Sequence, residues 1–530
     1  MIKTYVNKRY ILLPVDNDAQ VSKIEFYEGE GDEKKLLLDL DCKLAVNKTD
    51  FIACYDAREL LGKNAYIECP DGVEIGQSEQ KVLPEKDEYR PFAHFKPSVG
   101  WNNDPNGMIR YGGEYHAFYQ FNPCGRDWGN MHWGHAVGSD GITWEERDVA
   151  LFPDEDGTMF SGSAIEDENN VSGLKTGIRN PVLLFYTAAG GTNKLSKNKP
   201  FTQRIACSTD GGKTFVKLGG KPIIDCIAEG NRDPKVVRAE ELGKFLLALY
   251  LSGNDYALFT SDNLLDWSML QKITIAGESE CPDIYAFKRG DKTYRALIGA
   301  SDKYIIGEFS GGKFVPLTAV KRLSYSEKTG SGVPCSYAAQ SFSGTGDRVL
   351  RMPWNNIGSP SAVGSCELGL MQEITLTGEG EDMRLNVSPA KETVEAFGAE
   401  FVKSVPPHEK VCVPLERNAY LIKIECDCDD FELNVFGLHI DADAEKGALR
   451  VGKTEIPLCK GEKTDVTVII DRVSTEVYVG GVFATIAHVC DYSAPELNYS
   501  AKCETYSLTV GALKNIRSRA RKMSDRNIRA

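Results

Sequence analysis

The sequence lacks any long apolar run. No stretch approaches the roughly 20 apolar residues that a membrane-spanning helix requires. Near the N-terminus, the apolar segment Tyr10–Val15 is too short for the core of a secretion signal. We therefore expect a cytoplasmic protein that has no membrane partner.

The cysteines lack the spacing of metal ligands. Fifteen are present, an odd number, and the one close pair, Cys426 and Cys428, has no second pair nearby. The acidic run that contains Cys428 also lacks the spacing of a calcium-binding loop. This pattern predicts reduced, mostly buried thiols and no metal site.

The chain also has fewer basic than acidic residues. The chain has 62 Lys and Arg against 76 Asp and Glu, which gives a net charge of −14. This balance argues against nucleic acid and anionic membranes as partners and suits a neutral substrate. The sequence does not indicate an oligomeric state.

Glycine and aromatic residues are abundant. With 50 Gly, 22 Tyr and 22 Phe in 530 residues, the composition favours β structure with many tight turns. The length exceeds what one hydrophobic core normally serves. Residues 1–86 read as a small N-terminal β domain, whose predicted strands are Tyr10–Val15, Lys23–Tyr27, Lys35–Leu40, Phe51–Tyr55 and Ala65–Glu68.

A weak internal repeat follows. Polar turns closed by an aromatic residue recur at Ser139–Trp144, Ser208–Phe215 and Ser261–Trp267. Their period of roughly 50–70 residues is that of a propeller blade, so residues 87–387 are predicted to form a five-bladed β-propeller. We interpret these turns as structural and assign them no chemistry.

The remaining chain is predicted to be a helical linker and a second β domain. Ser388 can cap and Pro389 can start a helix within a linker at 388–397. Residues 398–515 read as a C-terminal β-sandwich, and 516–530 as a basic tail. The predicted sandwich strands are Tyr420–Glu425, Phe431–Phe436, Asp465–Ile470, Thr475–Val479 and Ser507–Val510.

Three short motifs carry candidate carboxyl groups. Asp104 lies in Trp101-Asn102-Asn103-Asp104-Pro105-Asn106-Gly107, where amide side chains could hold it ionised and Trp101 could stack on a sugar. Asp233 lies between Arg232, which could depress its pKa, and a proline. Glu280 begins Glu280-Cys281-Pro282-Asp283, where apolar neighbours would favour its protonated form. The first two motifs, taken alone, are typical of a turn, and each of the three is a weak signal by itself. We interpret Cys281 as a packing residue.

In this order the three motifs resemble glycoside hydrolase family 32, the invertase, inulinase and levanase family. Supporting blocks are Tyr115–Pro123, Trp128–His135, Phe160–Ala164, Tyr337–Gln340, Arg348–Trp354 and Asp471–Val477. The resemblance covers about residues 90–515 and implies a propeller followed by a sandwich. It also implies an enzyme that removes terminal β-fructofuranosyl units with retention of configuration and without a cofactor.

The resemblance also implies roles for individual residues. Asp104 would be the nucleophile, Glu280 the acid/base and Asp233 the stabiliser of the transition state, with the Asp104 and Glu280 carboxyl groups about 5–5.5 Å apart. The substrate-binding positions would be Asn103, Gln120, Trp128, Phe160, Ser161, Arg232 and Trp354. The preferred substrate among sucrose, fructo-oligosaccharides, inulin and levan stays open.

Other activities also fit these motifs, and parts of the sequence depart from the family's usual pattern. A fructosyltransferase would share the covalent intermediate, and a non-catalytic fructan-binding propeller would share the fold; an arabinan-cleaving propeller enzyme would also use three carboxylates. Asn102 stands where the family usually has Met or Leu, and residues 330–336 lack the usual acidic and aromatic pattern. The N-terminal β domain is not part of the common family architecture.

Overall fold

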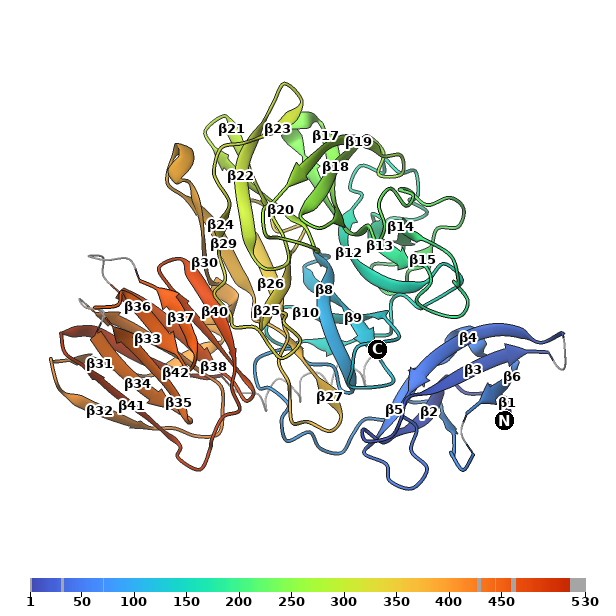
Figure 1. Cartoon of the computed structure of the whole chain (residues 1–530), viewed down its shortest axis with the longest axis horizontal. Coiled ribbons are helices and arrows are strands. Elements are labelled where there is room, and N and C mark those ends of the chain that lie inside the picture. Colours follow the sequence, from blue (N-terminus) through green and yellow to red (C-terminus); the bar gives the residue numbers. More distant parts are fainter. Residues whose placement is uncertain are drawn as a thin grey trace.

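The computed structural model describes residues 2–29, 33–69, 71–426, 430–443, 445–458 and 464–514. The predicted basic tail, 516–530, and Cys428 lie outside these ranges. The described chain is almost entirely β, and three groups of sheets follow one another along it (Figure 1). The predicted all-β class, with a five-bladed propeller, a C-terminal sandwich and an extra N-terminal β unit, is confirmed.

The N-terminal unit consists of two sheets, and the apolar core between them also includes Val99, Cys124 and Val363 of the propeller. The first contains, in spatial order, β1 (Ile2–Tyr5), β6 (Asn64–Glu68), β3 (Ser22–Glu28) and β4 (Lys35–Cys42). The second contains β5 (Phe51–Asp56), β2 (Tyr10–Val15) and β7 (Gly76–Ser78). All five strands predicted in this region form. A short 3-10 helix, η2 (Arg58–Leu60), precedes β6.

Five sheets form the propeller. The first contains β11 (Glu145–Glu146), β10 (His132–Gly138), β9 (Glu114–Asn122), β8 (Gly100–Tyr111) and β27 (Gly364–Ser365). The second contains β12 (Thr158–Glu166), β13 (Val182–Ala189), β14 (Phe201–Ser208) and β15 (Val216–Lys217). The third contains β16 (Arg232–Ala239), β17 (Lys244–Ser252), β18 (Asp255–Ser261) and β19 (Ser268–Thr274), with η3 (Glu240–Leu242) after β16.

The last two sheets complete the ring. The fourth contains β20 (Asp283–Arg289), β21 (Lys292–Ile298), β22 (Lys303–Ser310) and β23 (Lys313–Pro316), with β24 (Lys321–Arg322) pairing β22. The fifth contains β25 (Ser336–Ser341), β26 (Val349–Asn355), β29 (Gln372–Thr377) and β30 (Arg384–Pro389), with β28 (Glu367–Leu368) pairing β26 and η4 (Gly380–Asp382) before β30. The late strand β27 pairs in parallel with β8, so it ties the end of the ring to its beginning.

Each sheet is sandwiched between two neighbours, and this explains the hydrophobic middle strands. All eight residues of β13 are buried, because both of its faces pack against adjacent sheets. The first strand of each sheet, namely β8, β12, β16, β20 and β25, lies innermost and contacts its counterparts around the axis. The aromatic-closed turns found in the sequence connect the outer strands, for example β10 to β11 and β14 to β15.

The C-terminal sandwich has two six-stranded sheets. One contains β31 (Phe397–Val405), β42 (Thr505–Leu513), β33 (Tyr420–Cys426), β38 (Thr464–Ile470), β39 (Ser474–Val479) and β40 (Val482–Ala487). The other contains β32 (Lys410–Pro414), β41 (Glu496–Ala501), β34 (Asp430–Val435), β35 (Leu438–Asp443), β36 (Ala448–Val451) and β37 (Thr454–Pro457). The five strands predicted for this region form.

The helix before the sandwich differs from the prediction. Helix α1 spans only Lys391–Glu395, and Ala390 precedes it without a side-chain cap. Ser388 and Pro389 instead end β30, where they pair with β29, so the cap predicted at Ser388 is wrong. The sheet hydrogen bonds of β30 on one side and β31 on the other leave room for little more than one helical turn.

A buried ion cluster joins the propeller to the sandwich. His94 lies between Asp471, 3.0 Å from its Nδ1, and Glu476, 3.1 Å from its Nε2, and all three side chains are inaccessible to solvent. Asp471 also accepts the backbone N–H groups of Phe92 and Ala93. The sandwich is therefore held to the start of the propeller by charged groups rather than by apolar contact alone.

One cysteine departs from the expectation of reduced thiols. Most cysteines in the described ranges are free thiols, but Cys503 is disulfide-bonded, so the expectation of uniformly reduced cysteine does not hold there. Within those ranges, no helix combines the length and the apolar character needed to cross a membrane.

Candidate active site

The predicted carboxyl groups meet at one end of the propeller axis, where the inner strands begin. Four of the five inner strands are irregular there. The register shifts lie between Asn102 and Pro105 in β8, Phe160 and Gly162 in β12, Arg232 and Lys235 in β16, and Tyr337 and Gln340 in β25. Because a β-bulge re-aims the side chains beside it, these four irregularities place side chains of four blades at one end of the axis.

Local sequence accounts for three of these bulges. Pro105 and Pro234 directly follow Asp104 and Asp233, and a proline cannot donate the N–H that would continue the ladder. At Gly162, a Cβ atom would lie 1.9 Å from the carbonyl oxygen of Phe185, so only glycine permits this close approach. The Asp-Pro and Ser-Gly pairs thus produce the turns that expose the functional side chains.

Asp104 is a buried carboxyl group whose hydrogen-bond donors, Ser161, Gln120 and Cys281, are all neutral. Its Oδ2 accepts hydrogen bonds from Ser161 Oγ at 2.8 Å and from Gln120 Nε2 at 3.1 Å. Burial, reinforced by the nearby negative charge of Asp233, raises the pKa of Asp104 to about 7. The expectation that amides keep this group readily ionised is therefore wrong, because the loss of solvation outweighs the hydrogen bonds.

Asp233 lies beside Asp104 and shares a neighbour with it. The backbone N–H of Cys281 donates to Asp233 Oδ2 at 3.0 Å, and the Cys281 thiol lies 3.5 Å from Asp233 and 3.6 Å from Asp104. Burial raises the pKa of Asp233 to about 6 although the Arg232 guanidinium opposes this effect. The depressed pKa expected from the Arg232 neighbour is wrong for the same reason.

Glu280 occupies a more polar place than predicted. Its Oε1 accepts from Arg232 Nη2 at 2.6 Å and its Oε2 from the Tyr337 hydroxyl at 2.6 Å. The side chain is 34% exposed, whereas that of Asp233 is 6% exposed. The expected apolar setting is absent: Glu280 has a cation, a phenol and access to solvent.

The backbone at these positions is unusual for non-glycine residues. Asp233, Glu280, Cys281 and Ala338 have φ angles of 68°, 55°, 35° and 50°. Non-glycine residues adopt such angles rarely and at a cost of order 1 kcal/mol or more. Because four such residues lie around one axis, we infer that orienting these side chains costs the fold some local stability.

The predicted sugar-binding residues surround the carboxylates. Gln120 and Ser161 contact Asp104 directly, and Arg232 contacts Glu280. Asn103 is buried and its Oδ1 has no hydrogen-bond partner. Trp354 donates its Nε1–H to the carbonyl of Asn102 at 3.0 Å.

The two remaining predicted sugar-binding residues, Trp128 and Phe160, form an aromatic pair. Trp128 is 57% exposed, and its ring meets the Phe160 ring edge-on at 6.0 Å. Trp101, proposed from the sequence as a stacking platform, instead packs edge-on against Trp354 at 5.8 Å.

Two residues that contact the carboxylates were not assigned site roles from the sequence. Tyr337 was quoted only as part of a block, because nothing in a sequence shows that its hydroxyl reaches Glu280 from another blade. Cys281 was interpreted as packing, yet its thiol contacts both aspartates and its N–H donates to Asp233. Positive φ at Cys281 puts the two groups on the same side, which no sequence pattern reveals.

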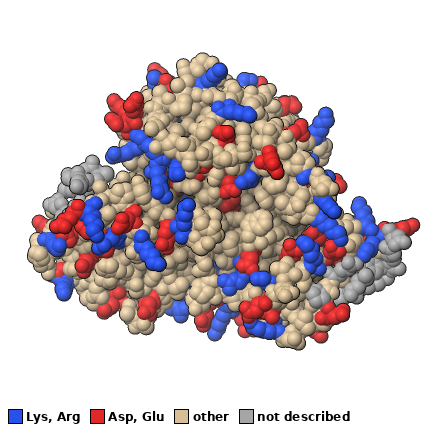
Figure 2. Space-filling view, in the orientation of Figure 1, with Lys and Arg blue, Asp and Glu red and all other residues tan. Residues whose placement is uncertain are grey.

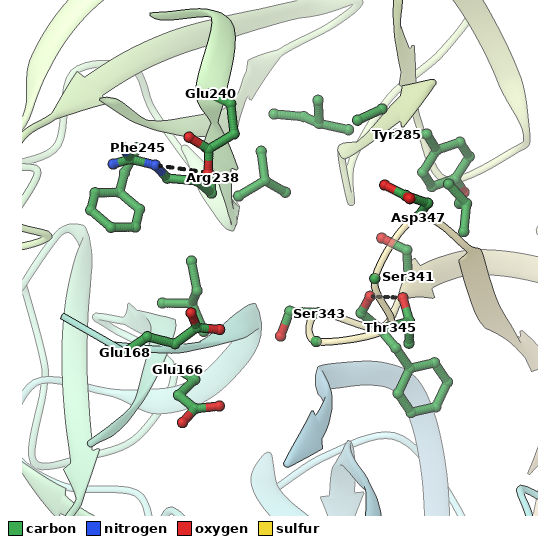
Figure 3. A pocket seen from close by; sticks show the side chains of 18 of the residues that line it. Glu166, Glu168, Arg238, Glu240, Phe245, Tyr285, Ser341, Ser343, Thr345 and Asp347 are labelled. Atoms are coloured by element: carbon green, nitrogen blue, oxygen red, sulfur yellow. Dashed lines mark hydrogen bonds and ion pairs between the residues drawn. The ribbon is translucent and has the colours of Figure 1, made fainter. Parts of the chain in front are cut away.

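The other end of the axis is separated from these carboxylates by a buried ion pair. Lys235 Nζ lies 3.2 Å from Asp283 Oδ1, with both side chains almost fully buried, and Lys235 also donates to Ser341. Beyond it, a cavity of about 420 Å³ is lined by side chains from the far ends of the inner strands. Figure 3 shows Glu166, Glu168 and Asp347 around this cavity, where Arg238 pairs with Glu240. The cavity contains none of the predicted site residues.

The surface charge is mixed on the face shown in Figure 2. Figure 2 shows Lys and Arg interspersed with Asp and Glu over the face that it presents, without a large area of one sign. Among the described residues, no group of three His, Cys, Asp or Glu side chains is placed to hold a metal ion. The arrangement offers two carboxyl groups in different environments and a third beside them, which is what acid-assisted nucleophilic displacement at a sugar carbon requires.

Comparisons with known proteins identify relatives. A family model described as "Glycosyl hydrolases family 32 N-terminal domain" matches residues 94–369. A levanase of Bacillus subtilis is 30% identical over 419 residues, which are 73% of this chain and 58% of that protein. An invertase of Schizosaccharomyces pombe is 34% identical over 254 residues, 43% of this chain and 42% of that protein. The chain thus spans about half the length of these curated relatives.

The fold also matches solved structures. The crystal structure of exo-inulinase from Aspergillus awamori aligns with a TM-score of 0.71 at 21% identity and covers 81% of this chain and 99% of that one. At that identity the match shows the fold alone.

Proposed function

Because the chain belongs to glycosyl hydrolase family 32, we propose that it is a retaining glycoside hydrolase that releases terminal β-D-fructofuranosyl units from sucrose, fructo-oligosaccharides or a fructan. The observation that carries this proposal is the grouping of three carboxyl groups from three blades. Asp104 is enclosed and has only neutral hydrogen-bond donors, whereas Glu280 is partly exposed and is held by Arg232 and Tyr337.

The difference in solvent access supports a division of roles, because the leaving group and the incoming water can reach Glu280 from the solvent side. Asp104 attacks the anomeric carbon of the fructosyl unit, and the bond from that carbon to the leaving oxygen breaks. Glu280, which is accessible from the solvent side, gives its proton to the leaving oxygen and takes one from the water that enters next. The water oxygen attacks the anomeric carbon of the covalent fructosyl–Asp104 intermediate, the bond from that carbon to Asp104 breaks, and fructose leaves with its original configuration.

Asp233 supports the transition state. As positive charge develops on the sugar ring, hydrogen bonds from fructose hydroxyls to a neighbouring carboxylate strengthen. Arg232 lies between Asp233 and Glu280, with Nε 3.8 Å from Asp233 Oδ2 and Nη2 2.6 Å from Glu280. Its charge offsets the repulsion among the three acids while the proton moves.

The test is fructose release from sucrose, a β-2,1-linked oligosaccharide and levan by wild type, Asp104→Asn and Glu280→Gln. We expect wild type to release fructose from at least one substrate and each variant to lose at least about 1000-fold in kcat. Asp262→Asn, which removes an exposed carboxylate paired with Lys244, is the matched control and should keep full activity.

Two further measurements distinguish hydrolysis from fructosyl transfer, and retention from inversion of configuration. Equal amounts of free glucose and fructose from sucrose indicate hydrolysis, whereas excess glucose indicates transfer of fructose to another sugar. NMR of the first product formed should show the β-anomer of fructose. If folded wild-type protein releases no fructose from any of the three substrates, the proposal is wrong.

A further inference from the structure

Strand β4 forms one of the contacts between the N-terminal β unit and the propeller. In the sheet β1-β6-β3-β4, strand β4 is an outer strand, so its free N–H and C=O groups need partners. The Asn130 side chain supplies them: its Oδ1 accepts from the N–H of Asp41 at 2.8 Å, and its Nδ2 donates to the C=O of Asp41 at 2.7 Å. One amide thus imitates the next strand of the sheet.

Two further contacts flank that pair. Cys42 donates its S–H to the carbonyl of Cys124 at 3.3 Å, and Lys43 Nζ lies 2.7 Å from Asp127 Oδ2. Three consecutive residues, 41 to 43, therefore bind one loop of the first blade, residues 124–130. We call this segment the Trp128 loop, because Trp128 lies between the contacts at Asp127 and Asn130.

The backbone of this loop depends on the same side chains. Asn130 has a φ of 44°, in the left-handed region that asparagine tolerates better than most residues. Its Nδ2 also donates to Asn122 Oδ1, and Asn122 in turn donates to the carbonyl of Asp127 at 2.8 Å. The position of the Trp128 backbone is thereby set from both sides.

A loop of the second blade is anchored on the same sheet. The backbone N–H of Lys194 donates to both carboxylate oxygens of Asp39, at 3.0 and 3.1 Å. Its Nζ lies 2.7 Å from Glu25 and 3.2 Å from the hydroxyl of Tyr27. Asp39, Glu25 and Tyr27 are all buried, so this contact satisfies groups that would otherwise be costly to bury.

These two loops border one aromatic wall. Trp128 meets Phe160 at 6.0 Å, and Phe160 meets Phe201, the residue that follows the Lys194 loop, at 5.4 Å. Phe160 directly precedes Ser161, whose hydroxyl contacts Asp104. The wall therefore runs outward from the nucleophile and ends in the exposed indole of Trp128, a flat apolar face suited to a sugar ring.

We propose that the N-terminal β unit belongs to the substrate-recognition machinery: through Asn130 it holds Trp128 against Phe160, so that this wall binds the sugar unit next to the terminal fructose. Asn130 and Lys43 are thus positioning residues, since they act through Trp128. This inference rests on the proposed function and extends it to a part of the chain outside the matched family segment.

The central variant is Asn130→Gly, because glycine keeps the positive φ while the amide is lost. We expect its KM for a β-2,1-linked trisaccharide to rise about tenfold, the scale of one lost aromatic contact, with kcat changed less than about twofold. Asn130→Asp keeps an acceptor for the Asp41 N–H and should show an intermediate KM. Lys48→Ala, which removes an exposed lysine elsewhere on the same unit, is the matched control.

A double-mutant cycle gives the decisive readout. If Asn130 acts through Trp128, then Trp128→Ala raises KM by itself and Asn130→Gly adds nothing to it. Lys43→Ala, a surface variant that will not unfold the protein, should raise KM about twofold and should also add nothing in the Trp128→Ala background.

Two results overturn the inference while the proposed function stands: unchanged KM in both Asn130→Gly and Lys43→Ala, or an Asn130→Gly effect that multiplies with that of Trp128→Ala. If wild type itself releases no fructose, the proposed function fails, and this inference fails with it.

Discussion

Replacing Asp104 with asparagine is expected to stabilise the protein at neutral and alkaline pH while it removes activity. The folded protein raises the pKa of Asp104 from 3.8 to about 7, chiefly by burial. Between these two values the folded state retains a proton that the unfolded state has lost, so stability falls as pH rises through this interval. The amide of the Asp104→Asn variant carries no charge and escapes this loss.

The size of the effect follows from the shift. Each unit of pKa is worth about 1.4 kcal/mol, so about three units give an upper value of about 4 kcal/mol. Weaker hydrogen bonds from Ser161 and Gln120 to a neutral amide reduce the expected gain to about 2–3 kcal/mol. For the propeller, this gain in stability corresponds to an increase in Tm of about 5 °C near pH 8.

The assay is thermal unfolding of wild type and Asp104→Asn from about pH 4 to pH 8. The two proteins should unfold at similar temperatures near the acidic end and diverge as pH rises. Asp56→Asn is the matched control of opposite sign, because Arg58 and Arg9 lower the pKa of Asp56 despite its burial. Asp56 stabilises the fold above its unfolded pKa, so its variant should be less stable near pH 8. Equal or lower stability of Asp104→Asn at pH 8 would refute the conclusion that burial makes the ionised Asp104 costly to the fold.

Three other outcomes are expected. Ser161→Ala removes a hydrogen bond that lowers the pKa of Asp104, so the acidic limb of kcat/KM should move up by about one pH unit; an unmoved limb would show that this limb does not report Asp104. Tyr337→Phe removes the hydroxyl that orients Glu280, and kcat should fall about tenfold with little change in KM or Tm. His94→Gln breaks the buried cluster at the sandwich and should cost about 3–5 kcal/mol near pH 6. Because Glu367, Asp471 and Glu476 raise the pKa of His94 well above its usual value against the effect of burial, the stability from its charge is present below pH 6.5 and lost as pH rises through the folded pKa. The gap between wild type and His94→Gln should therefore narrow in strongly alkaline buffer, and a constant gap would contradict this interpretation.

Alternating and apolar patterns were enough to predict ten strands in the N-terminal unit and the sandwich. Tyr10–Val15 is predicted and observed with the same bounds, and the middle strands of the blades show the continuous hydrophobicity of sheets that are covered on both faces. The helix near Ser388 was overestimated, since pairing of β30 with β29 overrode a local capping signal. Local signals thus performed well where tertiary packing agreed with them.

The sequence by itself indicated Asp104, Asp233 and Glu280 as candidates, because the order of their three motifs matches a known family although each motif alone is a weak signal. It also determined the β architecture, through turn residues and strand periodicity. Only the tertiary structure decided the electrostatics: burial and the mutual repulsion of carboxyl groups from different blades outweigh the adjacent Asn and Arg side chains. The structure alone brought Tyr337 to Glu280 and Asp41 to Asn130. Contacts between distant segments depend on how the sheets close into a ring, and no local pattern encodes that closure.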